Sequence, residues 1–398
     1  MLTNQTPDPK PQTLPNTPEP QAQMLANRVK KRFKHLQKWA KRSGFEAFRL
    51  YDRDIPEIPL VLDLYGGLIS GALYKRPYEK DPAEEALWLE TMREAVAQSL
   101  KMAPDNVIIK QRERKHGESQ YEKVAERGLT REIREGKYKF KVNLSDYLDT
   151  GLFLDRRALR ATVGAEARGK RVLNLFCYTA SFSVYAAGGG ALSTDSVDLS
   201  NTYLDWAREN FALNGIEAQR LRPEEYFAGS VFFTSHSVAG SQLQPLNPGP
   251  PLNRLIRADV TAFLERALAE RRANESRYTW DSIILDPPAF SNSTMARADF
   301  DLKRDYVPLL ADCLALLSPG GALWFSANAR SFKASAEELE KTLGEKASGL
   351  RVEDISGKVI DEDFRGKKGP KTFLIIREWG VGSREWKNPT PDSRFPIL

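Results

Sequence analysis

The segment RVLNLFCYTASFS, residues 171–183, decides how the rest of the chain folds. It opens with an apolar run of the length of a buried strand, turns through small and hydroxyl residues, and enters a helix at Ser181. Such a turn brings free backbone N–H groups and the positive end of a helix dipole to one point. The segment therefore predicts a strand, a turn and a helix arranged around a polar or anionic ligand group.

Strands and helices alternate regularly after this segment, as the sheet of an α/β protein requires. Residues 217–253 break the alternation, because they are rich in Pro, Ser, Gln and Gly and indicate a surface insertion. Ligands of such open sheets lie beyond the carboxyl ends of the strands. The expected strands cover residues 172–176, 192–198, 254–257, 281–286, 322–326 and, as a late strand, 372–377.

Acidic side chains follow three of these strands. Asp198 ends the second strand. Its distance along the chain from Asn174 is close to the spacing of roughly 20 residues at which an acid reaches the ribose hydroxyls of an adenosine cofactor. Asp259 follows the third strand, where it could accept from an adenine amino group, and Asp286 follows the fourth, where a substrate would meet the cofactor. Each acid alone could be a helix cap or a strand terminator. Four polar strand ends in register, with Asn174 on the first strand, favour a ligand site.

The turn after the first strand indicates which adenosine cofactor is expected. It lacks the G-x-G-x-x-G glycines that let a backbone approach a pyrophosphate, which disfavours a nicotinamide dinucleotide. An adenosine ligand with a sulfonium and an amino acid tail needs less space between itself and the backbone of the turn. S-adenosylmethionine is therefore the expected cofactor.

Length, charge and cysteine content limit the class of protein. The 398 residues exceed one average domain, and the net charge of +6 fits a polyanionic partner. Cys177 and Cys313 show no metal-ligand spacing, and the chain has no signal-like start and no apolar run of the roughly 18 residues that a membrane helix needs. We expect a cytoplasmic protein with two folded domains and with neither a metal nor a membrane partner, and we leave its oligomeric state open.

The first stretch of the chain predicts a tail followed by a basic helix. Residues 1–22 are rich in proline and poor in large apolar side chains, which is typical of disorder. Apolar residues then recur at helical spacing over 24–42, while the other faces carry cations with no acid among them. An ordinary solvated helix face is one interpretation, and contact with RNA phosphates is the other. The candidate contacts are Arg28, Lys30, Lys31, Arg32 and Lys34.

Residues 23–150 are expected to form a small basic α+β domain that binds RNA. Asp81 and Pro82 predict the start of a helix that runs to about Leu100. A polar loop after it places an aromatic ring among cations, which can stack a base between phosphate contacts, although exposed loops are often charged for solubility alone. The residues concerned are Lys110, Arg112, Arg114, Lys115 and Tyr121.

Several stretches of the chain resemble one family of enzymes. Residues 174–181, 196–207, 286–292 and 325–330 resemble the class I methyltransferase pattern. Together with 24–28, 51–57 and 146–155, they are most similar to the guanine-N7 methyltransferase domains of the bifunctional bacterial 23S rRNA guanine methyltransferases. The likeness spans about Met24 to Trp379.

The resemblance implies a Rossmann-like α/β fold with a mostly parallel seven-stranded sheet at 151–380, preceded by a small α+β domain, and a C-terminal extension at 381–398. Ala180 stands where the family usually has a glycine, and because the likeness covers only the guanine-N7 half of the bifunctional enzyme, we expect this chain to supply only the N7 activity. The implied cofactor residues are Asn174, Phe176, Tyr178, Thr179, Ala180 and Ser181 for the methionine part, Asp198 and Leu199 for the ribose, and Asp259 for the adenine, with Asp286 beside them. The residues implied to meet the target guanine are Asp286, Pro287, Pro288 and Phe290.

The resemblance also implies a reaction and a partner. Transfer of a methyl group to guanine N7 needs no proton removed first, so a site without an obvious base is expected. The expected partner is 23S rRNA or a large-subunit precursor. A cytosine-C5 methyltransferase would need a cysteine nucleophile, and neither Cys177 nor Cys313 directly follows the fourth or fifth strand. A guanine-N2 methyltransferase and a non-catalytic RNA-binding ribosome-assembly factor remain alternatives.

Overall fold

The structure is a computed structural model of the chain, and the parts it describes form two compact units. The first unit consists of Met1–Lys38 and Arg49–Arg114, and the second of Trp39–Phe48 and Lys115–Leu398. The candidate residues Arg114, Lys115 and Tyr121, the chain before Pro18, the middle of the expected insertion and the extension at 381–398 lie outside the described residues. The structure describes residues 18–74, 81–112, 128–147, 149–228, 252–273, 278–291, 299–328, 332–344, 349–367 and 369–378.

Two helices and a four-stranded sheet make up most of the first unit. The helices are α1 (Pro18–Ser43) and α2 (Pro82–Leu100), and the sheet order is β1 (Ala47–Asp52), β2 (Leu60–Tyr65), β3 (Leu68–Tyr74), β4 (Val107–Arg112). The predicted start of α2 is confirmed, because the Asp81 carboxylate accepts from the N–H groups of Ala83 and Glu84. Lys110 lies within strand β4, which extends to Arg112, so Arg112 does not belong to the polar loop that is expected there.

The expected disordered tail at 1–22 is wrong for its last residues, because α1 begins at Pro18. Proline is tolerated in the first turn of a helix, where its missing N–H leaves no hydrogen bond unmade. Ala22 is buried, and the Gln21 side chain accepts a hydrogen bond from the Trp88 indole of α2. Packing against α2 therefore extends the helix towards the N-terminus.

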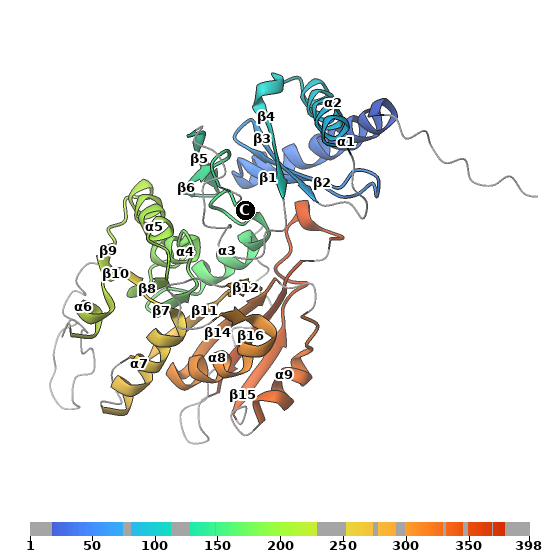
Figure 1. Cartoon of the computed structure of the whole chain (residues 1–398). Helices are drawn as coiled ribbons and strands as arrows, with labels where there is room; N and C mark the ends of the chain where they lie inside the picture. Colours follow the sequence, from blue (N-terminus) through green and yellow to red (C-terminus); the bar gives the residue numbers. More distant parts are fainter. Residues whose placement is uncertain are drawn as a thin grey trace, which may run out of the picture. The chain divides into compact units, whose positions relative to one another are not determined.

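An eight-stranded sheet organises the second unit, whose helices Figure 1 shows on both of its sides. Strands β9, β10, β8, β7, β11 and β14 are parallel, while β16 pairs antiparallel with β14 and β15. The sheet order is β15 (Leu350–Asp354), β16 (Lys371–Arg377), β14 (Leu317–Ala327), β11 (Trp280–Leu285), β7 (Arg171–Leu175), β8 (Ser193–Asp198), β10 (Leu252–Arg257), β9 (Gln219–Leu221). The helices are α3 (Arg157–Ala165), α4 (Ser181–Gly188), α5 (Asn201–Leu213), α6 (Pro223–Ala228), α7 (Val260–Ala273), α8 (Leu302–Leu316) and α9 (Ala336–Leu343).

The α/β fold predicted from the sequence is thus confirmed, with eight strands in place of seven. Strand β9 and helix α6 lie within the expected insertion at 217–253, so its first part has regular structure, with β9 as the edge strand of the sheet. Only three residues of β9 pair with β10, which explains why its pattern was too short to be read as a strand.

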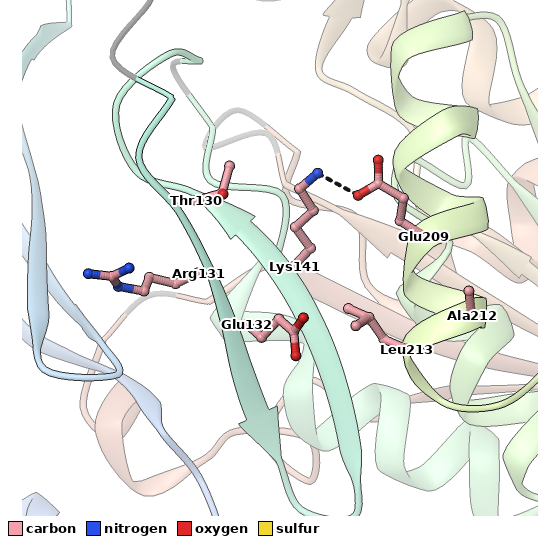
Figure 2. A pocket seen from close by; sticks show the side chains of 7 residues that line it. All are labelled: Thr130, Arg131, Glu132, Lys141, Glu209, Ala212 and Leu213. Atoms are coloured by element: carbon pink, nitrogen blue, oxygen red, sulfur yellow. Dashed lines mark hydrogen bonds and ion pairs between the residues drawn. The ribbon is translucent and has the colours of Figure 1, made fainter.

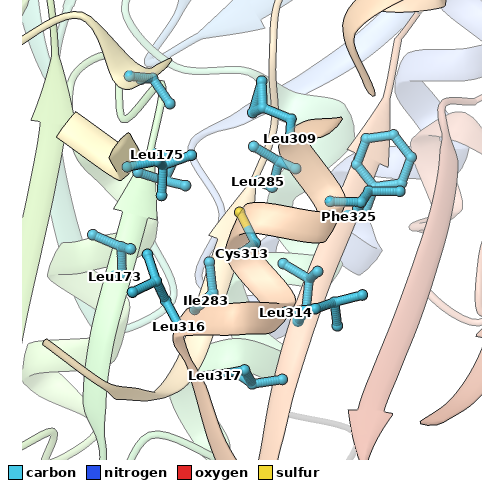
Figure 3. Packing of buried hydrophobic residues seen from close by; sticks show 14 of the residues in the cluster. Leu173, Leu175, Ile283, Leu285, Leu309, Cys313, Leu314, Leu316, Leu317 and Phe325 are labelled. Carbon is cyan, nitrogen blue, oxygen red and sulfur yellow. The ribbon is translucent and has the colours of Figure 1, made fainter. Parts of the chain in front are cut away.

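Alternate residues of the central strands pack into two separate cores. Leu173 and Leu175 of β7 and Ile283 and Leu285 of β11 face helix α8 around Cys313, as Figure 3 shows. Val172, Ile284 and Trp324 point to the other face, where they meet Leu159 of α3 and Phe182 of α4. Because side chains alternate along a strand, helices on both faces require apolar residues at nearly every position. The continuous apolar runs of β7 and β11 follow from this arrangement.

A β-hairpin joins the second unit through hydrogen bonds to helix α5. Its strands are β5 (Thr130–Glu135) and β6 (Tyr138–Asn143). Asn214 and Asn210 accept from the backbone N–H groups of Lys139 and Lys141, and the Trp206 indole donates to the Lys141 carbonyl. Side chains of α5 thus satisfy the free edge of β6, which would otherwise be open to pairing.

Candidate active site

The turn between β7 and α4 has an unusual backbone. Phe176, Tyr178 and Ala180 have positive φ angles of 54°, 54° and 56°, a region that residues other than glycine rarely adopt. The Ala180 N–H donates to the Cys177 carbonyl at 2.8 Å, and the Cys177 N–H donates to the Val197 carbonyl of β8 at 3.0 Å. Three such residues in one turn store strain, which is typical of functional sites. Ala180 therefore occupies a conformation that suits the glycine usual in the family.

Two other residues of the expected methionine site make hydrogen bonds within the protein. The Asn174 amide donates to Ser183 of α4 at 2.9 Å, and both side chains are buried. The Thr179 hydroxyl donates to the Gly151 carbonyl at 2.6 Å, and its own carbonyl accepts from Asn210 at 3.0 Å. These bonds fix the turn in place. A cofactor contact by Asn174 or Thr179 stays a prediction.

Asp198 connects the turn to the start of helix α5. One carboxylate oxygen accepts from the Tyr178 N–H and the other from the Ser200 N–H, both at 2.9 Å. Burial raises the pKa of Asp198 to about 6, although these N–H groups favour its charged form. The Leu199 N–H also favours this charged form. An ionised carboxylate has about four acceptor positions, so at least one remains for a ribose hydroxyl. The partly exposed Asp198 thus fits an adenosine cofactor.

Asp259 lies at the start of helix α7, where it also has a local role. Its carboxylate accepts from the Ala262 N–H at 3.0 Å and from the Thr261 hydroxyl, which makes it the N-cap of the helix. The interpretation as a helix cap therefore holds for this residue. The side chain is only partly buried, and a contact with adenine stays a prediction.

Asp286 follows β11 and forms a two-point ion pair with Arg156, a residue that the sequence did not single out as part of the site. Nε and Nη2 of Arg156 each donate to one oxygen of Asp286 at 2.9 Å, and Nη1 donates to Asp155 at 3.0 Å. Burial would lower the pKa of Arg156, but the charges of Asp286 and Asp155 raise it above its usual value. The guanidinium therefore stays charged and holds the acid in one orientation.

The residues after Asp286 differ in their exposure. Pro287 is buried and Pro288 is partly buried, while the Phe290 ring is 47% exposed at the start of the short strand β12 (Phe290–Ser291). Strand β12 pairs with β13 (Phe300–Asp301), directly before helix α8. The pairing fixes the backbone of a ring that is open to a ligand.

The neighbour of Arg156 in the sequence belongs to a different cluster. Arg157 is buried and donates to Asp361 and Asp363 at 3.1 Å, and to Glu135 of the hairpin at 3.3 Å. These bonds hold the hairpin, α3 and the chain after β15 together. Of the paired arginines at 156 and 157, only the first contacts a predicted site residue in the described structure.

Both cysteines are buried and poorly suited to act as nucleophiles. Cys177 lies in the β7–α4 turn and Cys313 within helix α8. Burial raises the pKa of each thiol well above its usual value, and the charge of Asp198 adds to the effect at Cys177. The thiolate is the reactive form of cysteine, so neither residue is activated for attack on a base.

The basic helix carries one ion pair that the sequence did not predict. Arg28 donates to Asp54 at 2.6 Å, so the expectation of a helix without counter-charge is wrong at this position. Lys30, Lys31 and Lys34 are exposed, and no ion-pair partner occurs for them among the described residues. These three lysines remain the clearest candidates for phosphate contacts.

A separate open hollow of about 590 Å³ lies between the β5–β6 hairpin and helix α5 (Figure 2). Two cations and two acids line it, and Lys141 pairs with Glu209 across it. Its charges balance, and it includes no predicted site residue. The lining residues are Thr130, Arg131, Glu132, Lys141, Glu209, Ala212 and Leu213.

The described helices include none with the length and apolar character needed to cross a membrane. Within the same residues, His, Cys, Asp and Glu side chains form no group of three or more that could hold a metal ion.

The mostly parallel sheet, with a strained turn after β7 and acids after β8 and β11, is the arrangement of a Rossmann-like fold and suits an adenosine cofactor. The model of a family described as S-adenosylmethionine-dependent methyltransferase matches residues 52–237. Ribosomal RNA large subunit methyltransferase K of Neisseria meningitidis serogroup B is 43% identical over 344 residues, which cover 86% of this chain and 84% of that protein. The chain therefore belongs to the S-adenosylmethionine-dependent methyltransferase family that includes this protein, and S-adenosylmethionine is its cofactor.

Other relatives agree with this assignment and confirm the resemblance seen in the sequence. Ribosomal RNA large subunit methyltransferase K/L of Pseudomonas fluorescens is 42% identical over 362 residues, which cover 91% of this chain and 41% of that protein. The chain thus spans about two fifths of the length of the K/L relatives that it matches. The crystal structure of SMU.776 with SAH, a protein assigned as a methyltransferase, has a TM-score of 0.62 at 22% identity and covers 89% of this chain and 81% of that one. This likeness supports the fold.

Proposed function

We propose that the protein transfers a methyl group from S-adenosylmethionine to N7 of a guanine in 23S rRNA. The similarity to ribosomal RNA large subunit methyltransferase K over 84% of that protein supports an rRNA substrate. The arrangement that carries the proposal is the row of polar groups along one edge of the sheet, with Asp198 after β8 and Asp286 after β11. A cytoplasmic location and binding of 23S rRNA or a large-subunit precursor are parts of the same proposal.

The site residues suit a reaction that depends on alignment. When bound, S-adenosylmethionine supplies an electrophilic methyl group on a sulfonium. Guanine N7 attacks with a lone pair in the ring plane, so no side chain has to remove a proton first. Asp198 binds the ribose, the β7–α4 turn binds the methionine part, and Asp286 and Phe290 hold the target base. The base must leave its stack to reach them, at a cost of about a few kcal/mol.

Two alternative reactions and one alternative class are less well supported. A cytosine-C5 transfer needs a thiolate, and both thiols are buried with raised pKa values. Transfer to guanine N2 is the competing reaction, because the bifunctional family that the chain resembles has both an N7 and an N2 activity. A non-catalytic RNA-binding factor would have no use for an intact acid pair at Asp198 and Asp286.

Mapping of the modified nucleotide tests the proposal. We expect mass spectrometry of 23S rRNA from cells with and without the gene to show one methylated guanine that depends on the gene. A 7-methylguanine makes the strand cleavable after borohydride reduction and aniline treatment, whereas an N2-methylguanine does not. Cleavage at that nucleotide supports N7 transfer, and a methylated guanine that resists cleavage would contradict it.

A further inference from the structure

The segment Gly151–Arg156 contacts both halves of the candidate site. The Gly151 carbonyl accepts from the hydroxyl of Thr179 in the β7–α4 turn at 2.6 Å. Five residues later, Arg156 donates to both oxygens of Asp286 at 2.9 Å. The segment therefore connects the turn after β7, on the cofactor side, with the acid after β11, on the substrate side.

Its backbone is fixed at several points between these ends. Gly151 has a φ of 95°, and a Cβ there would lie 2.1 Å from the Trp206 ring. The Phe153 carbonyl accepts from Arg160 at 2.8 Å, and Leu154 is buried in a short 3-10 helix that ends at Arg156. A segment held in this way can set the distance between two groups of a site.

The Phe153 side chain is open to solvent although the rest of the segment is held. Its ring is 40% exposed and contacts Tyr178 of the turn, with ring centroids 5.0 Å apart. Among the described residues, the four exposed large apolar side chains are Leu87, Phe153, Leu192 and Phe290. Two of these four are aromatic rings close in sequence to the Arg156–Asp286 pair: Phe153 precedes Arg156 by three residues, and Phe290 follows Asp286 by four.

We propose that Gly151–Arg156 forms a second wall of the target-base site, in which Arg156 is a positioning residue for Asp286 and Phe153 stacks on the RNA base. The inference rests on the proposed function, because it needs an RNA base as the occupant. A base taken out of its stack gains from an aromatic face, and such faces accept any base. Phe290 offers one face after β11, and Phe153 offers another beside the cofactor turn.

Arg156 acts through its geometry and its charge. A guanidinium with two parallel hydrogen bonds fixes the plane of a carboxylate, whereas an ammonium cannot. Held in this plane, Asp286 keeps its remaining acceptor positions in fixed directions. An orientation error in a transfer reaction lowers the rate more than the affinity.

Arg156→Lys and Arg156→Gln test the positioning role. For Arg156→Lys we expect kcat on 23S rRNA to fall about 10- to 100-fold, with the Kd for S-adenosylhomocysteine within about threefold of wild type. For Arg156→Gln we expect a larger fall in kcat. In the double variant with Asp286→Asn, kcat should be little lower than in Asp286→Asn alone, since Arg156 acts through that acid. Equal effects on kcat and on the cofactor Kd, or fully additive losses, would overturn the role.

Phe153→Ala tests the stacking role, with Leu192→Ala as its matched control. Leu192 is 45% exposed and directly precedes β8, so it lies at the amino end of that strand, whereas the site lies at the carboxyl ends of the strands. We expect Phe153→Ala to lower kcat/KM for 23S rRNA roughly 5- to 150-fold, as the loss of one stacked base predicts. Phe153→Tyr and Leu192→Ala should stay within about twofold of wild type. A raised cofactor Kd with an unchanged KM for RNA would show that the ring serves the cofactor and would overturn the stacking role.

Direct binding separates this inference from the proposed function. Retention of a 23S rRNA transcript on filters, in the presence of S-adenosylhomocysteine, measures RNA affinity without any transfer. If wild type transfers no methyl group to rRNA, the proposed function fails. The inference is then decided by binding alone, where weaker RNA binding by Phe153→Ala and not by Leu192→Ala supports it and equal binding refutes it.

Discussion

Asp198 is a single carboxylate whose ionisation should control cofactor binding. Its raised pKa of about 6 means that the folded protein without ligand binds a proton more tightly than an ordinary aspartate does. Ribose hydroxyls donate best to the charged form, so the affinity should be greatest above pH 6 and decrease as the pH falls through that value. Calorimetry with S-adenosylhomocysteine should show a loss of up to about tenfold per pH unit below pH 6.

The variant Asp198→Asn separates this effect from other titrations. An amide does not ionise in this range, so the variant should bind more weakly at pH 8 and show a nearly flat affinity between pH 5 and pH 8. A profile that keeps the wild-type slope would assign the pH dependence to another group.

Ala180 has a left-handed conformation that glycine adopts at no steric cost. Its φ of 56° and ψ of 30° are unfavourable for alanine by about 1 kcal/mol, partly offset because glycine is more flexible when unfolded. We expect Ala180→Gly to raise the free energy of unfolding by about 0.5 kcal/mol in urea titrations. Ala186→Gly, at an ordinary helical position of α4, should lower it by about 1 kcal/mol. A loss in both variants would mean that the Ala180 methyl group contributes more by packing than the backbone loses by strain.

At the scale of elements, the backbone conformation of the segment Gly151–Arg156 depends on a glycine that packs closely against the ring of Trp206. Gly151→Ala places a methyl group 2.1 Å from Trp206 in addition to the strain of a positive φ. Gly169→Ala is the matched control, because Gly169 has a φ of 71° but no atom within 4 Å of the added Cβ. We expect a loss of about 1 kcal/mol for Gly169→Ala, and about 3 kcal/mol or more for Gly151→Ala, in thermal or urea unfolding. Equal losses would show that the Trp206 ring moves aside freely.

Elements with strong local signals could be predicted from the sequence, and those fixed by distant contacts could not. The apolar runs of β7 and β11 and the cap at Asp81 are local, so their positions were found. Arg156 and Asp286 are 130 residues apart, and no local pattern shows which of two adjacent arginines meets the acid. The start of α1 depends on Trp88 in α2, and strand β9 on pairing with β10. These features depend on contacts between residues far apart in the sequence, which the local periodicity of apolar residues does not reveal.

At the scale of the whole molecule, the net charge of +6 bears on how the protein meets a long polyanion. Binding to RNA releases counterions in proportion to the phosphates contacted, so the affinity depends on salt as well as on any single contact. The exposed lysines of α1 make such contacts possible without reading the sequence of the RNA. They should act on affinity, while Asp286 and Phe290 act on the reaction.

Charge reversal on α1 tests this division. Lys30, Lys31 and Lys34 changed to Glu should weaken binding to 23S rRNA and reduce the slope of log K against log salt by about 2, since each lost phosphate contact on single-stranded RNA accounts for roughly 0.7. The control changes Lys303, Lys341 and Lys358 to Glu, three exposed lysines of the second unit, and alters the net charge equally. We expect the control to change the slope by less than half as much. Equal slopes for the two variants in filter binding between 50 and 200 mM salt would mean that overall charge, and not helix α1, governs RNA affinity.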